Sequence, residues 1–164
     1  MVEDGTTAQE NARKKALVYA KTLGKTVLSM DNALYFADLE DDPRQPGINV
    51  RRFAEGKERP SDQEMLTYYL DLIANLGGEI KGRWEFAVCI ATPSGEFKET
   101  TIVSPRTFTS TPGSKITEGY PLESLQKDPK TGKYVSEMTR SEAAEFWNRQ
   151  IGKPLQEFVL LVLR

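Results

Sequence analysis

The chain has 164 residues, enough for one domain with a buried core, and its charged and apolar fractions are those of an ordinary soluble globular protein. Its formal net charge of −2 gives no indication of a nucleic-acid partner, and no apolar run is long enough to span a membrane. The sequence has no histidine and a single cysteine, Cys89, which excludes Ser-His-Asp and Cys-His catalysis, His-ligated metals and an intrachain disulfide.

Hydrophobic periodicity and turn residues predict alternating helices and strands along the chain. In the first part of the chain, we expect a helix over 6–26, a strand over 26–29, a second extended segment over 33–39, a loop over 40–48 and a short helix over 49–56. A longer helix over 61–78 follows, and then strands over 83–92 and 96–104 joined by a turn at 93–95. A long loop over 105–133 and a helix over 139–164 complete the series. Capping boxes, Ser61 with Glu64 and Thr139 with Glu142, mark the starts of two of these helices. Pro154 should kink or break the last one.

This order of elements predicts a mixed α/β fold (α+β), with helices flanking one central sheet. The sequence contains no internal repeat, low-complexity segment or domain linker, so we expect a single domain over residues 1–164. The first residues lack the apolar core of a signal peptide, and a cytoplasmic location is the default expectation.

Without histidine, catalysis would depend on carboxylates, lysines, arginines, hydroxyl groups or a hard cation with oxygen ligands. One cluster of such groups opens the first predicted helix, where Glu10 precedes Lys14 and Lys15. A helix N-terminus attracts anions, so the lysines would help to hold phosphate, and the carboxylate could carry magnesium. The structural alternative is that Thr7 and Glu10 form a capping box and that Glu10 pairs with Lys14. On these residues alone, the structural interpretation is favoured.

Three further positions carry polar groups that suit a ligand site. Asp31 follows a predicted strand, where it could bind a cation or orient a water; the alternative is an Asx-turn. Arg51 and Arg52 follow a Pro-Gly turn and could bind phosphate, or form a solvated surface. Arg149 lies beside Trp147 on a helix and could cover that ring rather than contact a ligand.

Taken in chain order, several short motifs resemble the inosine triphosphate pyrophosphatase family, the Ham1-like pyrophosphatases of non-canonical purine nucleoside triphosphates. The resemblance covers nearly the whole chain and depends on the ordered series, since no single motif is specific. The matching segments are "TTAQENARKKALVYAK", "TVLSMDNAL", "QPGINVRRFA", "FAVCIATPSGEF", "EGYPLES" and "YVSEM".

The resemblance implies an elongated ITPase-like domain with a mixed sheet, which is usually a homodimer and hydrolyses nucleoside triphosphates to a monophosphate and pyrophosphate with Mg²⁺. It assigns the metal to Glu10 and Asp31, catalysis to Asp31 and Lys15, and substrate binding to Lys15, Arg52, Gly119, Tyr120 and Arg149. The implied partner is a nucleoside triphosphate, with no nucleic acid and no membrane.

The chain also departs from the pattern of the resembled family. The family opens with a strand and a Thr-x-x-Asn-x-x-Lys phosphate loop, and we expect this domain to lack both. Met30 replaces the first aspartate of a pair, Asn148 replaces a histidine and Ala143 a lysine, and residues 118–122 depart from Phe-Gly-Tyr-Asp-Pro. Two hypotheses follow: a pyrophosphatase that is weak or altered in substrate, and a catalytically inactive nucleotide-binding or interaction protein that retains the fold.

Overall fold

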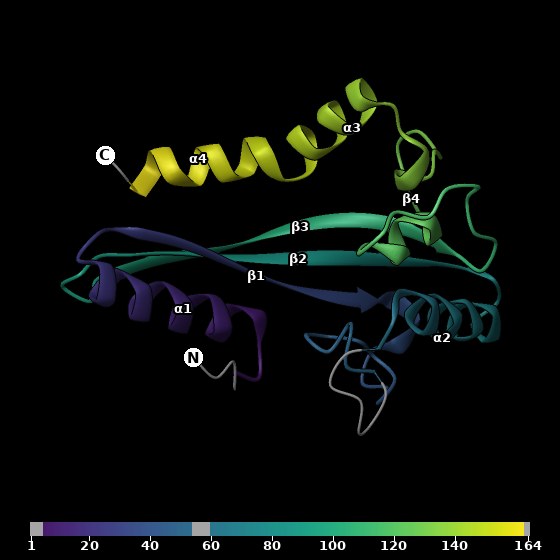
Figure 1. Ribbon diagram of the computed structural model, residues 1–164, viewed down its shortest axis with the longest axis horizontal. Helices are drawn as coiled ribbons and strands as arrows, with labels where there is room; N and C mark the ends of the chain where they lie inside the picture. The colour runs from purple at the N-terminus through teal and green to yellow at the C-terminus, as the bar shows by residue number, and fades with distance from the viewer. Residues whose placement is uncertain (1–4, 54–59, 163–164) are drawn as a thin grey trace.

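The computed structural model describes residues 5–53 and 60–162. It shows an elongated molecule in which one long, twisted sheet carries helices on both sides (Figure 1). Its principal elements are α1 (Ala8–Leu23), β1 (Val27–Phe36), α2 (Asp62–Asn75), β2 (Glu79–Ala91), β3 (Phe97–Thr109), β4 (Gln126–Lys127), α3 (Arg140–Trp147) and α4 (Lys153–Val162).

The four strands lie in the order β1-β2-β3-β4, and each pairs antiparallel with the next. The predicted class, one α/β domain with a sheet flanked by helices, is therefore confirmed, although within the described residues the sheet is antiparallel where a mixed sheet was expected. None of the helices in the described parts of the chain is long and apolar enough to cross a membrane.

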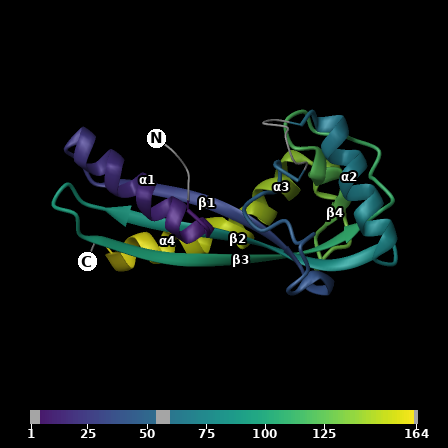
Figure 2. The same cartoon turned by 90° about the horizontal axis from the view of Figure 1, so that it is seen from below.

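One face of the sheet is covered by α1, which packs through small residues. Thr7 caps the start of α1, and Gly24, with φ of 62°, ends it in the left-handed conformation, as its glycine predicts. The buried stripe of α1 consists of alanines at helical spacing, which lets the helix lie close to the strands. The residues in this contact are Ala8, Ala12, Ala16, Ala20, Ala33, Ala87, Cys89 and Ala91. Seen from below, α1 crosses in front of the strands and α4 lies behind them (Figure 2).

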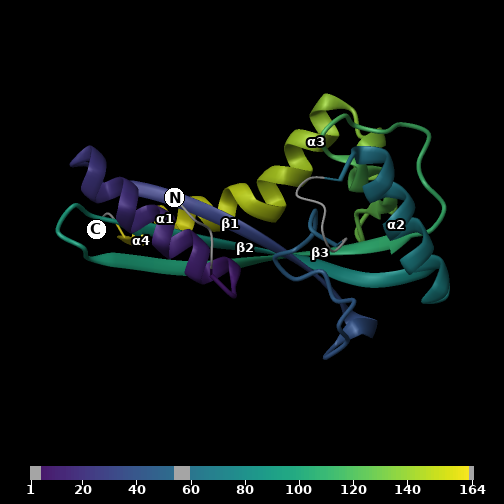
Figure 3. The same ribbon diagram turned by 60° about the horizontal axis from the view of Figure 1, so that its bottom comes forward.

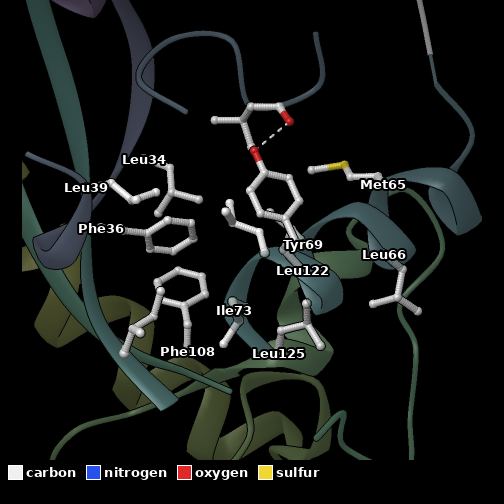
Figure 4. Packing of buried hydrophobic residues seen from close by; sticks show 13 residues of the cluster. Leu34, Phe36, Leu39, Met65, Leu66, Tyr69, Ile73, Phe108, Leu122 and Leu125 are labelled. Atoms are coloured by element: carbon white, nitrogen blue, oxygen red, sulfur yellow. Dashed lines mark hydrogen bonds between the residues drawn. The ribbon is translucent and has the colours of Figure 1, made fainter. Parts of the chain in front are cut away.

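The opposite face of the sheet carries two apolar clusters, one near each end. At one end, α2 packs onto Leu34, Phe36 and Phe108, and the Tyr69 hydroxyl donates to the Val50 carbonyl over 2.9 Å (Figure 4). At the other end, Ile151, Leu155 and Phe158 of the C-terminal helices pack onto Phe86, Val88 and Ile102. Figure 3 shows α2 and α1 near opposite ends of the sheet.

Four sequence predictions need correction. The segments predicted at 26–29 and 33–39 join into one strand, β1, which ends at Phe36, and Ala37–Leu39 forms a short 3-10 helix. Asp31 therefore lies in the middle of a strand, opposite Ala87, rather than after its end. Polar residues interrupt the apolar pattern because the two faces of β1 meet different surroundings. Residues 49–53 contain a turn and no helix, and residues 54–56 of that predicted helix lie outside the described residues. The predicted loop over 105–133 begins with the end of β3 and also contains β4, so it is shorter than expected.

The C-terminal helix contains a change of geometry at the expected place. Asn148–Gly152 forms a π-helical turn, closed by the Lys153 N–H donating to the Asn148 carbonyl. Pro154 has no N–H to donate and would crowd the carbonyl four residues earlier, and a widened turn relieves that conflict. The helix then resumes as α4, so Pro154 alters the helix without ending it.

Candidate functional site

The predicted catalytic residues Asp31 and Lys15 lie together on the α1 face of the sheet. Lys15 Nζ is 2.8 Å from Asp31 Oδ1 and 3.2 Å from the Met30 carbonyl oxygen. The two side chains are only 17% and 18% exposed. Asp31 lies sixteen residues after Lys15 in the chain, and the two side chains meet because α1 packs along β1. The resemblance assigned both groups to catalysis, and the structure brings them into a partly buried ion pair; their catalytic role stays a prediction.

Glu10, the other predicted metal ligand, caps the start of α1. Its Oε2 accepts hydrogen bonds from the Thr6 N–H and hydroxyl over 2.8 and 2.9 Å, and its own N–H donates to Thr7 Oγ1 over 3.1 Å. The bonds from Thr6 lower the pKa of Glu10. The Thr7 cap on the Glu10 N–H agrees with the structural interpretation of the sequence, but the bonds to the Glu10 carboxylate come from Thr6, one residue before the Thr7 N–H that would close a capping box.

The magnesium site implied for Glu10 and Asp31 can be tested against these contacts. Each carboxylate has an oxygen engaged by a protein donor: Thr6 for Glu10 and the Lys15 ammonium for Asp31. The described residues contain no group of three or more Asp, Glu, Cys or His side chains able to hold a metal ion. They do not fit a magnesium site built by the protein alone, because such a site needs several free oxygen ligands. The metal role of Glu10 and Asp31 stays a prediction.

A cavity of about 390 Å³ lies on the other face of the sheet, over the stretch between the two apolar clusters. This volume is within the usual range for small-ligand sites. Asn32, next to Asp31 on β1, lines the cavity, whereas Asp31 contacts α1; successive residues of a strand point to opposite faces. The walls include four aromatic residues, Trp84, Phe86, Tyr120 and Trp147.

The rim of the cavity is a loop whose geometry is held by α2. The Gly119 N–H donates to Asp62 Oδ2 over 2.6 Å, and Arg51 donates both to the Gly119 carbonyl and, over 3.1 Å, to Asp62 Oδ1. The bond from Gly119 is the main cause of the lowered pKa of Asp62. Gly119 has φ of 80°, a conformation that glycine adopts without strain. Tyr120 is thereby presented at the cavity with 67% of its surface exposed.

Gly119 and Tyr120, which the resemblance assigned to a base-binding loop, line the cavity, and that role stays a prediction. The arginine in the wall is Arg51. Arg52, the predicted substrate ligand, is exposed and is not among the residues that line the cavity. No local signal distinguishes the two neighbouring arginines. The choice depends on Asp62, eleven residues later, and on Gly119, which lies much further along the chain.

Gln126 and Trp84 form a polar contact in the cavity wall that sequence inspection missed. The Trp84 indole N–H donates to Gln126 Oε1 over 2.9 Å, and Gln126 is only 5% exposed. Gln126 belongs to β4, the two-residue strand that pairs with β3 opposite Phe108. A strand this short has no periodic pattern, so its sequence gives little signal.

Arg149 lies outside the main cavity. It donates to the buried Asp128 carboxylate over 2.8 Å, and both line a smaller cavity of about 80 Å³. Its guanidinium lies 5.8 Å from the Phe146 ring, so it does not cover Trp147 as the sequence alternative proposed. Burial acts to raise the pKa of the Asp128 carboxyl, but hydrogen bonds from the Lys130 N–H, Arg149 and Thr131 together outweigh it and leave the pKa lowered. The substrate-binding role of Arg149 stays a prediction.

A buried arginine, Arg106, lies behind the aromatic wall. It is 1% exposed, and its guanidinium lies 4.4 Å from the Phe146 ring centre and 5.5 Å from that of Trp147. One of its nitrogens donates to Ser104 and to the Pro105 carbonyl, while Nε and Nη2 have no partner in the described residues. Burial lowers the pKa of Arg106 to about 10, which leaves it charged at neutral pH. Its side chain supports Trp147 from behind.

The fold is an α/β domain, and its sheet carries a recessed cavity, partly walled by aromatic rings, whose volume suits a small ligand. The sequence profile of the Ham1 family matches residues 1–151, and the chain belongs to the Ham1 family. Two relatives are named dITP/XTP pyrophosphatase. The protein of Brucella melitensis is 31% identical over 151 residues, which are 85% of this chain and 64% of that protein. The protein of Syntrophobacter fumaroxidans is 30% identical over 161 residues, 96% of this chain and 63% of that protein.

The chain therefore spans less than two-thirds of the length of these two relatives. Among solved structures, the Staphylococcus aureus Ham1 protein matches with a TM-score of 0.75 and 24% identity, over 96% of this chain and 79% of that one. A HAM1 protein from Coxiella burnetii matches with a TM-score of 0.75 and 19% identity, over 98% and 80%. At these identities the structures establish the fold alone, and that fold agrees with the family assignment.

Proposed function

We propose that this protein hydrolyses non-canonical purine nucleoside triphosphates, such as dITP and XTP, to the monophosphate and pyrophosphate. The observation that carries the proposal is the match to the Ham1 family over residues 1–151. The two relatives from Brucella melitensis and Syntrophobacter fumaroxidans are named for this activity. The cavity supports it, because a flat base suits walls formed by Trp84, Phe86 and Trp147, and the Gly119–Tyr120 loop lies at its rim.

The proposed path of the substrate follows from β1. In the described sheet β1 is an edge strand, with Asn32 toward the cavity and Asp31 toward α1. A nucleotide with its base in the cavity would pass its triphosphate around this edge to reach Lys15 and Asp31. There, the Lys15 ammonium would contact phosphate oxygens and give up part of its contact with Asp31.

In the proposed reaction, Asp31 accepts a proton from a water molecule whose oxygen bonds to the α-phosphorus. The bond from that phosphorus to the bridging oxygen of the β-phosphate breaks, and pyrophosphate leaves with the electron pair. Catalysis of this kind relies on positioning and charge, and requires no histidine. The described residues offer no magnesium site of their own, so no step here is assigned to the metal. The requirement for Mg²⁺, a homodimeric state and a cytoplasmic location remain predictions from the resemblance.

The test is pyrophosphate release from dITP, ITP and XTP, with ATP and GTP for comparison, with and without magnesium. The wild type should release pyrophosphate from the non-canonical nucleotides, and Asp31→Asn should lower the rate by about 100-fold or more. Asp38→Asn, the same change at an exposed carboxylate just after β1, is the matched control and should leave the rate unchanged. No release from any nucleotide would refute the activity, and full activity of Asp31→Asn would refute the role of Asp31.

A further inference from the structure

We infer that Gln126, held by Trp84, selects nucleotides whose base carries a carbonyl oxygen rather than an amino group at purine position 6. The inference rests on the proposed function and adds to it a residue that discriminates between substrates. It starts from the hydrogen bond of 2.9 Å between the Trp84 indole N–H and Gln126 Oε1. An indole N–H can only donate, so this bond determines which end of the Gln126 amide is oxygen and which is nitrogen.

The remaining end of the amide is a hydrogen-bond donor available to the cavity. Gln126 lines the cavity together with Trp84. Within residues 5–53 and 60–162, no protein group accepts from Gln126 Nε2, and this nitrogen is not among the fully buried atoms without a partner. The backbone of Gln126 pairs with β3, opposite Phe108, and this pairing fixes the position from which the side chain reaches the cavity. The geometry therefore presents the N–H groups of Gln126 to a bound ligand, in a cavity that Asn32 and Glu123 also line.

The aromatic wall places a base beside this donor. Trp84 and Phe86 both line the cavity, and their rings are nearly parallel, at 29° and 6.4 Å between centres. A base lying along these rings would bring its polar edge to Gln126. Hypoxanthine, xanthine and guanine carry a carbonyl oxygen at position 6, which accepts from an N–H. Adenine carries an amino group there, which would face Gln126 donor to donor and leave both groups unpaired.

Rotation of the amide cannot rescue adenine. Turning the Gln126 oxygen toward the ligand would direct its NH₂ group at the Trp84 N–H, so the conflict would only move to the other end of the amide. The wild type should therefore bind ITP roughly tenfold or more tightly than ATP. Gln126 gives no discrimination between hypoxanthine and guanine, which share the 6-carbonyl group.

Binding can be measured through the fluorescence of the protein's own tryptophans. The chain contains two tryptophans, and both Trp84 and Trp147 line the cavity. ITP and ATP are titrated separately and the ratio of their dissociation constants is compared between variants. The two nucleotides carry the same triphosphate charge, so the ratio cancels the effect of any charge that a substitution adds.

Gln126→Glu is the decisive variant, because a carboxylate can still accept from Trp84 while its second oxygen faces the ligand as an acceptor. The preference should then invert in favour of ATP. Trp84→Phe removes the bond that orients the amide, and its ITP-to-ATP ratio should fall toward one, with Trp147 as the remaining reporter. Gln63→Glu, the same substitution on the exposed surface of α2, should keep the wild-type ratio.

Each of the following results would overturn the inference. If Gln126→Glu binds nucleotides with the wild-type preference, or if the wild type binds ITP and ATP equally, the inference is wrong and the proposed function stands. If the wild type binds no purine nucleotide, the inference and the proposed function both fail. Should Gln126→Glu not fold, as judged by circular dichroism, the Trp84→Phe ratio decides alone, and an unchanged ratio there refutes the inference.

Discussion

Tyr69 links the core of α2 to the wall of the cavity, and Tyr69→Phe tests how much that link stabilises the protein. The Tyr69 side chain is fully buried, and its hydroxyl donates to the carbonyl of Val50, which lines the cavity. Phenylalanine keeps the ring and its edge contact with Phe36, at 6.2 Å between centres, but leaves the Val50 carbonyl without this donor. A buried carbonyl that loses its only donor in the described residues costs about 1–2 kcal/mol.

For a chain of this size, that loss corresponds to a fall of roughly 3–6 °C in melting temperature. The assay is urea and thermal unfolding followed by circular dichroism. The matched control is Tyr68→Phe: this ring stacks on Phe53 at 4.2 Å, and its hydroxyl has no hydrogen-bond partner in the described chain. We expect the control to change the unfolding free energy by less than about 0.5 kcal/mol. Equal stability of the two variants would refute the assigned role of the Tyr69 hydrogen bond.

Two further predictions concern the sheet and the C-terminal helices. Gly82→Ala should lower the unfolding free energy by about 1–3 kcal/mol in urea titrations, because the new Cβ would lie 2.7 Å from the Phe108 ring; wild-type stability would show that the ring moves freely. Glu142→Gln should lower the melting temperature at pH 6 but not at pH 2. The Lys133 ammonium and the Thr139 cap lower the pKa of Glu142 to about 2, so its stabilising effect is complete above about pH 5 and is lost as the pH falls toward 2. An equal difference at both pH values would contradict this assignment.

The features that local sequence determines were predicted well. The capping boxes at Ser61 and Thr139 and the left-handed Gly24 are confirmed, because each depends on residues within one helical turn. The buried strand around Cys89 and the turn after it are likewise confirmed, since an apolar run followed by Pro-Ser-Gly specifies them over a short range.

The site was predicted less completely, because its residues are brought together by long-range contacts. Alternation along β1 separates Asp31 from Asn32, and the apolar pattern around them suggested a break instead. Arg51 is selected over its neighbour only by its contacts with Asp62 and Gly119. Gln126 lies in a strand too short to detect, and its importance depends on Trp84, 42 residues earlier.

The π-helical turn at Asn148–Gly152 sets the angular phase between two parts of the C-terminal helix. An α-helix advances about 100° per residue, so the additional residue in a widened turn rotates everything after it by about that angle. Trp147, before the turn, borders the cavity, while Leu155 and Phe158, after it, pack on the sheet. Shortening the turn by one residue would leave the composition almost intact but rotate one apolar surface out of register with the other. The number of residues between Trp147 and α4 is therefore constrained as strictly as the identity of the side chains on either side of the turn.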